Sequence, residues 1–363
     1  MTSYGKNIDI RVFGGSHDEE IGVRVSKLPA GIKIDLPALL AFMKRRAPGN
    51  NKHSTSRSEP DTPVFVSGVD DKLTTNGDEF CAVIKNTNAH SSDYSTVKRV
   101  PRPSHADYCA VMKYGENVDL RGGGHFSGRL TAPLCILGGI LKNELKKKNI
   151  KIAAHILSIG AEHDRAFDAL DPEKKDFSIL GGAHFPVLDE AAGERMRDII
   201  EKARLSCDSV GGKIECAVNG LPVGVGEHMF SGMESRISSI MFSVPAVKGI
   251  FFGESEAASM YGSEYNDPFY TDGKSVFTKT NHCGGIQGGM TNGMPLIFTV
   301  SVKPTPSIAK KQQSVDLFAM ENTDLQIKGR HDPCIVPRAV PVIEAAAAIA
   351  IYDALLDESE PEV

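Results

Sequence analysis

The spacing of apolar residues predicts four helices. Residues 36–46 (LPALLAFMKRR) show helical spacing, end in basic residues and are stopped by Ala-Pro-Gly. Residues 131–148 and 189–205 repeat apolar positions at intervals of three and four. Residues 339–356 (AVPVIEAAAAIAIYDALL) are rich in alanine. Small side chains let neighbouring helices approach closely, so this last helix is predicted to lie inside the core.

Four further segments read as strands because glycine or proline bounds each apolar run. They are KIAAHILSIGA (151–161), GGKIECAVNG (211–220), AVKGIFFG (246–253) and PLIFTVSVK (295–303). The predicted strands and helices do not alternate in a strict β-α-β rhythm. This order favours an α+β fold over a parallel doubly wound sheet.

Composition predicts a globular chain, and the lack of an internal linker favours one domain, although the length also allows two or three. The 363 residues are 41% hydrophobic and 24% charged, as in an ordinary folded protein, and no low-complexity linker or fixed-period repeat divides them. We expect a single domain over 1–356 and an acidic C-terminal tail over 357–363. The net charge of −5 gives no general electrostatic reason to bind nucleic acid or an anionic membrane, so any basic cluster is local to a site.

The cysteines predict neither disulfides nor zinc. Their number is odd, they are scattered, and no C-x-x-C pair occurs. The N-terminal stretch MTSYGKNIDIRVFGG has charges among its apolar residues, and no window approaches an uninterrupted membrane span. We therefore expect a cytoplasmic protein that does not act at a membrane.

Common nucleotide-binding signatures are missing. RGGGHFSGR (121–129) contains three consecutive glycines but lacks the G-K-[ST] ending of a P-loop, and no G-x-G-x-x-G stands between a predicted strand and helix. The same segment is a plausible oxyanion-binding nest followed by polar side chains, although a plain glycine turn remains open.

Other polar stretches lie among glycines and prolines. FGGSHDEEIG sets a serine and a histidine after two glycines, RPSHADY sets a histidine where proline excludes a helix interior, and KRRAPGNNKHSTSR concentrates cations in an acidic chain. Polar residues also lie next to glycine or proline in HCGGIQGGMTNG, VKPTPS and KGRHDPC. Each alone has a structural alternative: a loop histidine, a solvated basic face, or an Arg–Asp salt bridge.

Taken together and in order, these stretches resemble the chorismate synthase family. Its pattern has a Gly-Glu-Ser-His-Gly start, Arg-Arg-x-Pro-Gly, Arg-Pro-Gly-His-Ala-Asp-Tyr, a glycine-rich segment, Gly-Gly-Ile-x-Gly-Gly, Lys-Pro-Thr and Arg-His-Asp-Pro. The resemblance runs from Ile10 to about Leu356. It implies an anti 1,4-elimination of phosphate from 5-enolpyruvylshikimate 3-phosphate to give chorismate, the last common step of aromatic amino acid biosynthesis. The reaction requires reduced FMN, and the family is also associated with NADP.

The resemblance assigns roles to individual residues. Three are implied to be catalytic: His17 at the departing phosphate, His105 in keeping the reduced flavin correctly protonated, and Asp332 in proton removal. Residues implied to bind substrate or nearby phosphate groups are Ser16, Arg46, Lys52, Arg102, Arg129 and Arg330. Those implied to hold FMN are His125, Phe126, Ser127, Ala246, Gly288, Lys303, Pro304, Thr305, Pro306, Ser307 and Arg330. No metal is implied.

The resemblance also implies a fold and partners. Members are homotetramers in which helices lie between antiparallel sheets, so we expect a single-domain sandwich with helices packed between and around the sheets. The chain lacks the long insertions of members that reduce their own flavin, which implies an external flavin reductase.

The chain departs from the family pattern at several positions. Gly15 and Leu130 stand where the family has glutamate, and Asp18 and Ser104 stand where it has glycine. Lys52 stands where the family has arginine. Two alternatives to the family activity stay open. One is a flavin-binding protein of the same fold without lyase activity. The other is a metal hydrolase, although H-E-x-x-H and comparable ligand spacings are missing from the sequence.

Overall fold

The computed structural model describes residues 3–47, 61–86, 98–115, 117–180, 182–327 and 332–357. All strand pairings within the two larger sheets are antiparallel. The first sheet has four strands in the order β1-β2-β4-β3 and the second has five in the order β6-β5-β7-β13-β8. The four-stranded sheet contains β1 (Asp9–Phe13), β2 (Glu20–Ser26), β3 (Val64–Ser67) and β4 (Phe80–Lys85). The five-stranded sheet contains β5 (Lys151–Ile159), β6 (Glu162–His163), β7 (Gly212–Asn219), β8 (Val247–Phe252) and β13 (Leu296–Val302).

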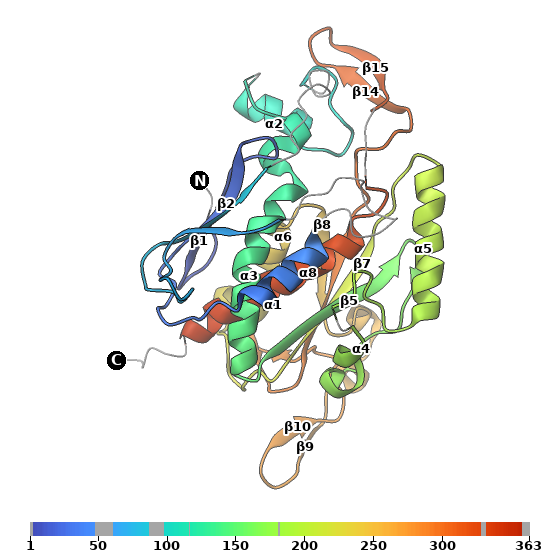
Figure 1. Ribbon diagram of the computed structural model, residues 1–363. Helices are drawn as coiled ribbons and strands as arrows, with labels where there is room; N and C mark the ends of the chain where they lie inside the picture. The colour runs from blue at the N-terminus through green and yellow to red at the C-terminus, as the bar shows by residue number, and fades with distance from the viewer. Residues whose placement is uncertain are drawn as a thin grey trace.

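Helices pack between the two sheets and around them (Figure 1). Helix α3 contacts both sheets, through β2, β4 and β5, whereas α8 contacts α3, α1, α6 and the five-stranded sheet. Helix α5 packs on β5 and β6 (Figure 1). The longer helices are α1 (Leu36–Arg46), α2 (Asp107–Tyr114), α3 (Thr131–Lys147), α5 (Glu190–Leu205), α6 (Met233–Ser243) and α8 (Val336–Asp357), and the short ones are α4 (Ser178–Leu180) and α7 (Gly262–Tyr265).

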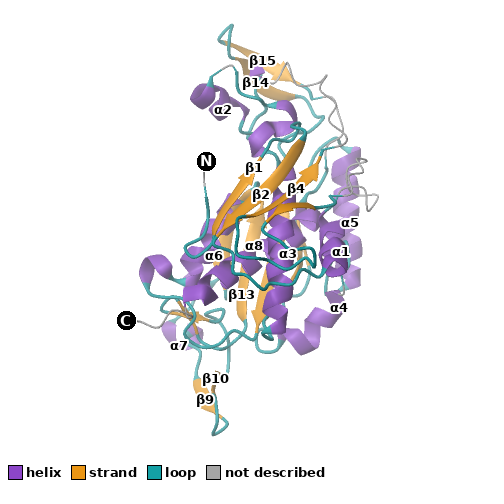
Figure 2. Ribbon diagram, turned by 60° about the vertical axis from the view of Figure 1, so that its left-hand side comes forward, coloured by secondary structure: helices purple, strands orange, loops and turns teal. Residues whose placement is uncertain are grey.

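The described chain also contains three small two-stranded sheets. They are β9 (Phe269–Thr271) with β10 (Val276–Thr278), β11 (Ile286–Gln287) with β12 (Met290–Thr291), and β14 (Gln312–Asp316) with β15 (Glu321–Leu325). The β14–β15 hairpin lies at the same end of the molecule as α2, and the β9–β10 hairpin lies at the opposite end (Figure 2). The expected α+β sandwich is confirmed. The predicted helices and strands also match α1, α3, α5, α8, β5, β7, β8 and β13 within a few residues.

Close packing of α3 on α8 follows from small residues. A Cβ atom added to Gly138 of α3 would lie 2.3 Å from Cβ of Ala345 on α8, a distance that packed atoms do not adopt. The alanines from Ala345 to Ala348 are fully buried. Helix α8 is long and apolar enough to cross a membrane by length and composition, with a mean hydropathy of 1.8, but 83% of that stretch is buried inside the protein. Its apolar character is that of a central core helix.

The carboxylate of Glu344 links the three central helices α1, α3 and α8 through ion pairs. Glu344 of α8 accepts hydrogen bonds from both terminal nitrogens of Arg45 at the end of α1, at 2.9 and 2.8 Å, and pairs with Lys142 of α3. Its Oε1 also accepts from the backbone N–H of Ala154 on β5. Burial alone would raise the pKa of Glu344, but the two cations hold it at about 2.

The segment before β1 is bound to the C-terminal part of α8. The carboxylate of Asp353 accepts backbone N–H bonds from Lys6, Asn7 and Ile8, at 2.8 to 3.1 Å, and pairs with Arg236 of α6. The segment before the first strand is therefore held by the last described helix.

Candidate active site

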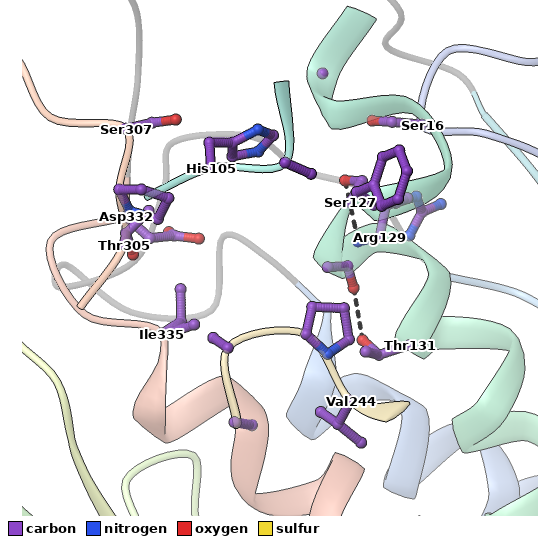
Figure 3. Close-up of a pocket in the computed structure, with 18 of the residues that line it drawn as sticks. Ser16, His105, Ser127, Arg129, Thr131, Val244, Thr305, Ser307, Asp332 and Ile335 are labelled. Atoms are coloured by element: carbon purple, nitrogen blue, oxygen red, sulfur yellow. Dashed lines mark hydrogen bonds between the residues drawn. The ribbon is translucent and has the colours of Figure 1, made fainter. Parts of the chain in front are cut away.

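A cavity of about 610 Å³ lies where several separate chain segments meet. The loop between β1 and β2, the end of α1 and the segment before α2 form part of its wall. The glycine-rich turn before α3, the α6–β8 connection, the segment after β13 and the start of α8 form the rest. Figure 3 shows side chains from these segments arranged around one hollow.

The structure brings together most residues that the sequence singles out. Those that line the cavity are Ser16, His17, Arg46, Arg102, His105, His125, Phe126, Ser127, Arg129, Ala246, Lys303, Thr305, Pro306, Ser307 and Asp332. Pro304 and Gly288 are not among its lining residues. Gly288 lies between β11 and β12 with a φ of 62°. Lys52 and Arg330 lie outside the described residues.

The glycine-rich turn lets the backbone approach the first histidine. Gly122, Gly123 and Gly124 have φ values of 57°, 91° and 52°, in the left-handed region that side chains disfavour. A Cβ atom on Gly122 would lie 2.4 Å from Cε1 of His17 and 2.6 Å from Oγ of Ser16. The backbone N–H of Ser16 also donates to the carbonyl of Gly124, at 3.2 Å. Glycine at position 122 is therefore required to seat Ser16 and His17 at the cavity.

His105 belongs to a hydrogen-bonded cluster with Arg102 and Asp107. Its Nδ1 lies 2.6 Å from Oδ1 of the fully buried Asp107. Arg102 donates to the same carboxylate through Nε at 2.6 Å and Nη2 at 2.7 Å. Burial would raise the pKa of Asp107, but hydrogen bonds from Arg102 and His105 lower it far below its usual range.

An ionised carboxylate accepts hydrogen bonds only, so we assign the Nδ1 proton of His105 to the bond with Asp107. This tautomer leaves Nε2 as the nitrogen that can accept or release a proton. A Cβ atom placed on Gly123 of the glycine-rich turn would lie 3.5 Å from that Nε2 atom. The imidazole is thus oriented by a buried acid on one side and lies against the glycine-rich turn on the other.

Arg102 is largely committed to partners within the protein. Besides Asp107, it donates from Nη1 to Oγ of Ser307 at 3.1 Å, which joins the segment before α2 to the segment after β13. Lys303 makes a second link, because its Nζ donates to the carbonyl of Ser104 at 2.6 Å. Burial, with a smaller contribution from Lys248, lowers the pKa of Lys303. These two cations hold the His105 segment in place as well as lining the cavity.

A second buried acid joins two other arginines. Asp61 accepts from Nη1 of Arg46 at 2.7 Å and pairs with Nη1 of Arg129. Arg46 also donates to the carbonyl of Gly128 at 3.0 Å, while Nε of Arg129 donates to Oδ1 of Asn86 at 3.1 Å. Burial opposes ionisation of Asp61, but the two guanidiniums outweigh it and lower its pKa.

Asp332 precedes α8 and forms an ion pair with Arg338 of that helix. Nη1 of Arg338 donates to Oδ2 of Asp332 at 2.7 Å, and Nε of Arg338 donates to the backbone carbonyl of Arg46 at 3.2 Å. Arg338 therefore connects the acid to the arginine-rich side of the cavity. Burial lowers the pKa of Arg338, although Asp332 opposes that effect.

Sequence reasoning missed Asp61, Asp107 and Arg338. Asp107 stands two residues after His105 in a stretch that was already of interest, so a search for an acid able to orient that histidine would have found it. Arg338 lies six residues after Asp332, beyond the motif that carried the prediction. Asp61 resembles an ordinary surface acid until the fold brings Arg46 and Arg129 to it.

A family model described as chorismate synthase matches residues 8–356. The chain belongs to the chorismate synthase family. It is 42% identical to a chorismate synthase of Lancefieldella parvula, over 98% of this chain and 96% of that relative. It is 41% identical to one of Korarchaeum cryptofilum, over 97% of each.

A solved structure of a chorismate synthase matches with a TM-score of 0.76 at 25% identity, covering 98% of this chain and 93% of the other. The family resemblance seen in the sequence is confirmed, and the chain is similar throughout to lyases of the shikimate pathway.

Proposed function

We propose that this protein converts 5-enolpyruvylshikimate 3-phosphate to chorismate and inorganic phosphate with reduced FMN as its cofactor. The single observation that carries the proposal is the cavity, where Arg46, Arg102, Arg129, Lys303 and Arg338 gather from separate segments of a chain with a net charge of −5. A substrate with two carboxylates and a phosphate needs such a local concentration of cations.

The binding role of these cations depends on their orientation. Asp61 holds Arg46 and Arg129 side by side, and Asp107 holds Arg102. Each buried acid compensates part of the positive charge in the free protein and fixes guanidinium geometry before the substrate arrives. Such preorganisation reduces the free-energy cost of ordering side chains when the anion binds.

The cavity also has features that suit FMN. Phe126, Val244, Ala246 and Ile335 provide apolar surface for a flat ring system. The hydroxyl of Thr305 is buried and has no hydrogen-bond partner among the described residues, so it is open to a polar ligand atom. Lys303 supplies a cation close to this hydroxyl in the chain. When bound, reduced FMN supplies electron density that assists the loss of phosphate.

The protein side chains provide proton transfer and charge stabilisation. We assign His17 to donation of a proton, or of positive charge, to the departing phosphate. Nε2 of His105 holds or releases a proton at the cavity, since its Nδ1 is engaged by Asp107. Asp332, which pairs with Arg338, assists removal of the proton that leaves carbon 6 of the substrate.

Anaerobic phosphate release tests this function. Purified protein with the substrate and reduced FMN is expected to release phosphate and form chorismate, and omission of reduced FMN should abolish both. A protein that binds reduced FMN and substrate but releases no phosphate would be the non-lyase flavoprotein of the same fold. Reduced FMN is proposed to come from an external flavin reductase, and the proposed compartment is the cytoplasm.

A homotetramer is also proposed. Val223, Met229, Phe230 and Met290 are exposed side chains, and Phe230 is 89% exposed. They gather around the β11–β12 turn, because Met233 donates its N–H to the carbonyl of Gly289 and Val223 pairs with Asn292. An apolar surface of this kind suits a contact between copies of the chain.

Gly288 lies in this same turn. Because Gly288 does not line the cavity of its own chain, we propose that it contacts FMN bound in the cavity of another copy. Light scattering of the wild type should give the mass of a tetramer, and Phe230→Glu should reduce that mass. A monomeric wild type would contradict this part of the proposal.

A further inference from the structure

A second pocket lies outside the candidate active site, where α1, α3 and the chain after α4 meet. Its volume is about 490 Å³, within the range of small-molecule sites. Helix α1 crosses α3 in this region (Figure 1). The polar lining comes from Lys44, Arg45, Lys142, Asn143 and His184, and we call this the basic pocket.

The charges in the basic pocket are unbalanced. Arg45 and Lys142 share one carboxylate, that of Glu344, so this trio carries a net positive charge. The pocket lining contains no acidic residue among the described part of the chain. Burial lowers the pKa of His184, and the positive charges of Lys44 and Arg45 lower it further. An anion bound beside these cations would reduce their mutual repulsion.

Two buried nitrogen atoms in the lining residues lack hydrogen-bond partners. They are Nε of Arg45 and Nδ1 of His184, considering the part of the chain that the structure describes. Buried polar atoms normally find a partner, and an unsatisfied one costs free energy. Both unsatisfied atoms belong to residues of the same pocket, so a ligand with acceptor oxygens suits it.

The rest of the lining is small and apolar. Ala38 and Ala41 of α1 and Gly139 of α3 leave room between the helices, and Phe42 forms an aromatic wall. The Nζ of Lys142 lies 5.3 Å from the centroid of the Phe42 ring and the guanidinium carbon of Arg45 lies 5.8 Å from it. Cationic and apolar surfaces therefore adjoin.

We infer that the basic pocket binds a small organic carboxylate that carries an apolar ring and no ammonium group. The carboxylate meets Arg45, Lys142 and His184, while the ring contacts the surface formed by Ala38, Ala41 and Phe42. An ammonium group would be repelled by the same cations, which excludes ordinary amino acids. This binding site is separate from the proposed lyase function, since none of its residues lines the cavity of the candidate active site.

Calorimetric titration of the whole protein with benzoate tests the inference. Benzoate should bind, and phenylalanine and inorganic phosphate should bind at least 10-fold more weakly. Lys142→Met should weaken benzoate binding by about 10-fold or more, the effect of losing one charged hydrogen bond. Lys147→Met, which removes an equal charge from the same helix outside the pocket, is the matched control and should leave benzoate binding unchanged.

A second variant preserves every charge. Ala41 is exposed on α1, so Ala41→Trp should fold normally while its ring fills the pocket, and benzoate binding should be lost. In the wild type, the imidazole resonances of His184 followed by NMR should show that benzoate raises its pKa, because an adjacent anion favours the charged imidazole. Equal benzoate binding by wild type, Lys142→Met and Ala41→Trp would place it elsewhere and overturn the inference. Equal affinity for phosphate and benzoate would overturn the assigned ligand class.

Discussion

The Nδ1 atom of His105 lies 2.6 Å from Oδ1 of Asp107, which is buried beside Arg102. The relationship separates two functions of the imidazole: one nitrogen is fixed by an acid and the other remains available at the cavity. A histidine held in this way has a defined tautomer, which is a prerequisite for acid–base chemistry at a chosen atom. It also makes the roles of His105 and His17 distinguishable by experiment.

Substitution of the two histidines should impair different steps. His105→Asn keeps a hydrogen-bond donor and acceptor but cannot titrate near neutral pH, so turnover with saturating reduced FMN should fall by roughly 10- to 1,000-fold. The spectrum of bound reduced flavin should change, with little effect on substrate affinity. His17→Ala should slow phosphate release and leave that spectrum near wild type. Full activity of His105→Asn would show that position 105 only shapes the loop.

Asp107→Asn should reproduce much of the His105 defect without removing the imidazole. The neutral amide cannot stabilise the charged form of His105, and it offers an N–H where the histidine needs an acceptor. We expect turnover to fall by about 100-fold, within the range typical of acid–base groups. The pH profile of turnover should also shift, which a purely structural loss would not produce. An unchanged profile with reduced protein stability would assign Asp107 to folding alone.

Asp61→Asn should expose the charge that Asp61 compensates. Removal of one member of a buried ion cluster costs about 3–5 kcal/mol, and urea unfolding should show a loss of this order. An anionic ligand can then replace the missing carboxylate between Arg46 and Arg129. Substrate should therefore raise the melting temperature of the variant more than that of the wild type. Equal thermal shifts would indicate that these arginines do not meet the substrate.

Glu344 should make the protein sensitive to acid. Its pKa is about 2 in the folded protein against an ordinary 4.5, so its ionised form stabilises the fold above pH 4.5. That contribution, about 3 kcal/mol, is lost as pH falls from 4.5 towards 2. Urea unfolding at pH 5 and pH 3 measures the part of this loss that falls between the two pH values, about 2 kcal/mol. In Glu344→Gln, which is less stable at neutral pH, the decrease between these pH values should be smaller by a similar amount.

Ser104→Gly should stabilise the segment that carries His105. Ser104 has a φ of 58°, and the family pattern has glycine at this position. A left-handed conformation costs a residue with a side chain about 1–2 kcal/mol, whereas glycine loses about 0.4–1 kcal/mol more entropy on folding. The expected net gain is therefore between zero and about 1.6 kcal/mol, measurable by urea unfolding. A loss of stability would mean that the serine side chain has a compensating contact.

The sequence predicts elements best where their pattern is distinctive. Helix α1 is recognisable because basic residues and an Ala-Pro-Gly stop follow its apolar spacing, and β13 because glycine and proline bound a long apolar run. Strands β1, β2 and β4 were not predicted. Charged residues interrupt β1 and β2, and the continuous apolar run of β4 is equally compatible with a short buried helix.

The candidate site is predictable as far as its motifs extend. His17, His105 and Asp332 each lie in a short stretch whose neighbours restrict the backbone, so sequence reasoning identifies them. The acids that orient the arginines cannot be found in this way, because their partners are distant: Asp61 and Arg129 are 68 positions apart. Such pairs depend on how α1, α3 and the intervening loops come together, and local patterns contain no information about that distance.

The bond between Asp353 and the backbone of Asn7 spans 346 positions. Helix α8, which carries Asp353, is also the central helix against which α1, α3 and α6 pack. During synthesis, β1 therefore leaves the ribosome long before Asp353, which binds the segment preceding β1, has been added to the chain. Assembly of the core must wait for almost the whole described chain, and such long-range closure is slow. Until α8 is made, the apolar faces of α3 and of the five-stranded sheet that pack against it stay uncovered, and exposed apolar surface of this kind favours aggregation of the incomplete chain.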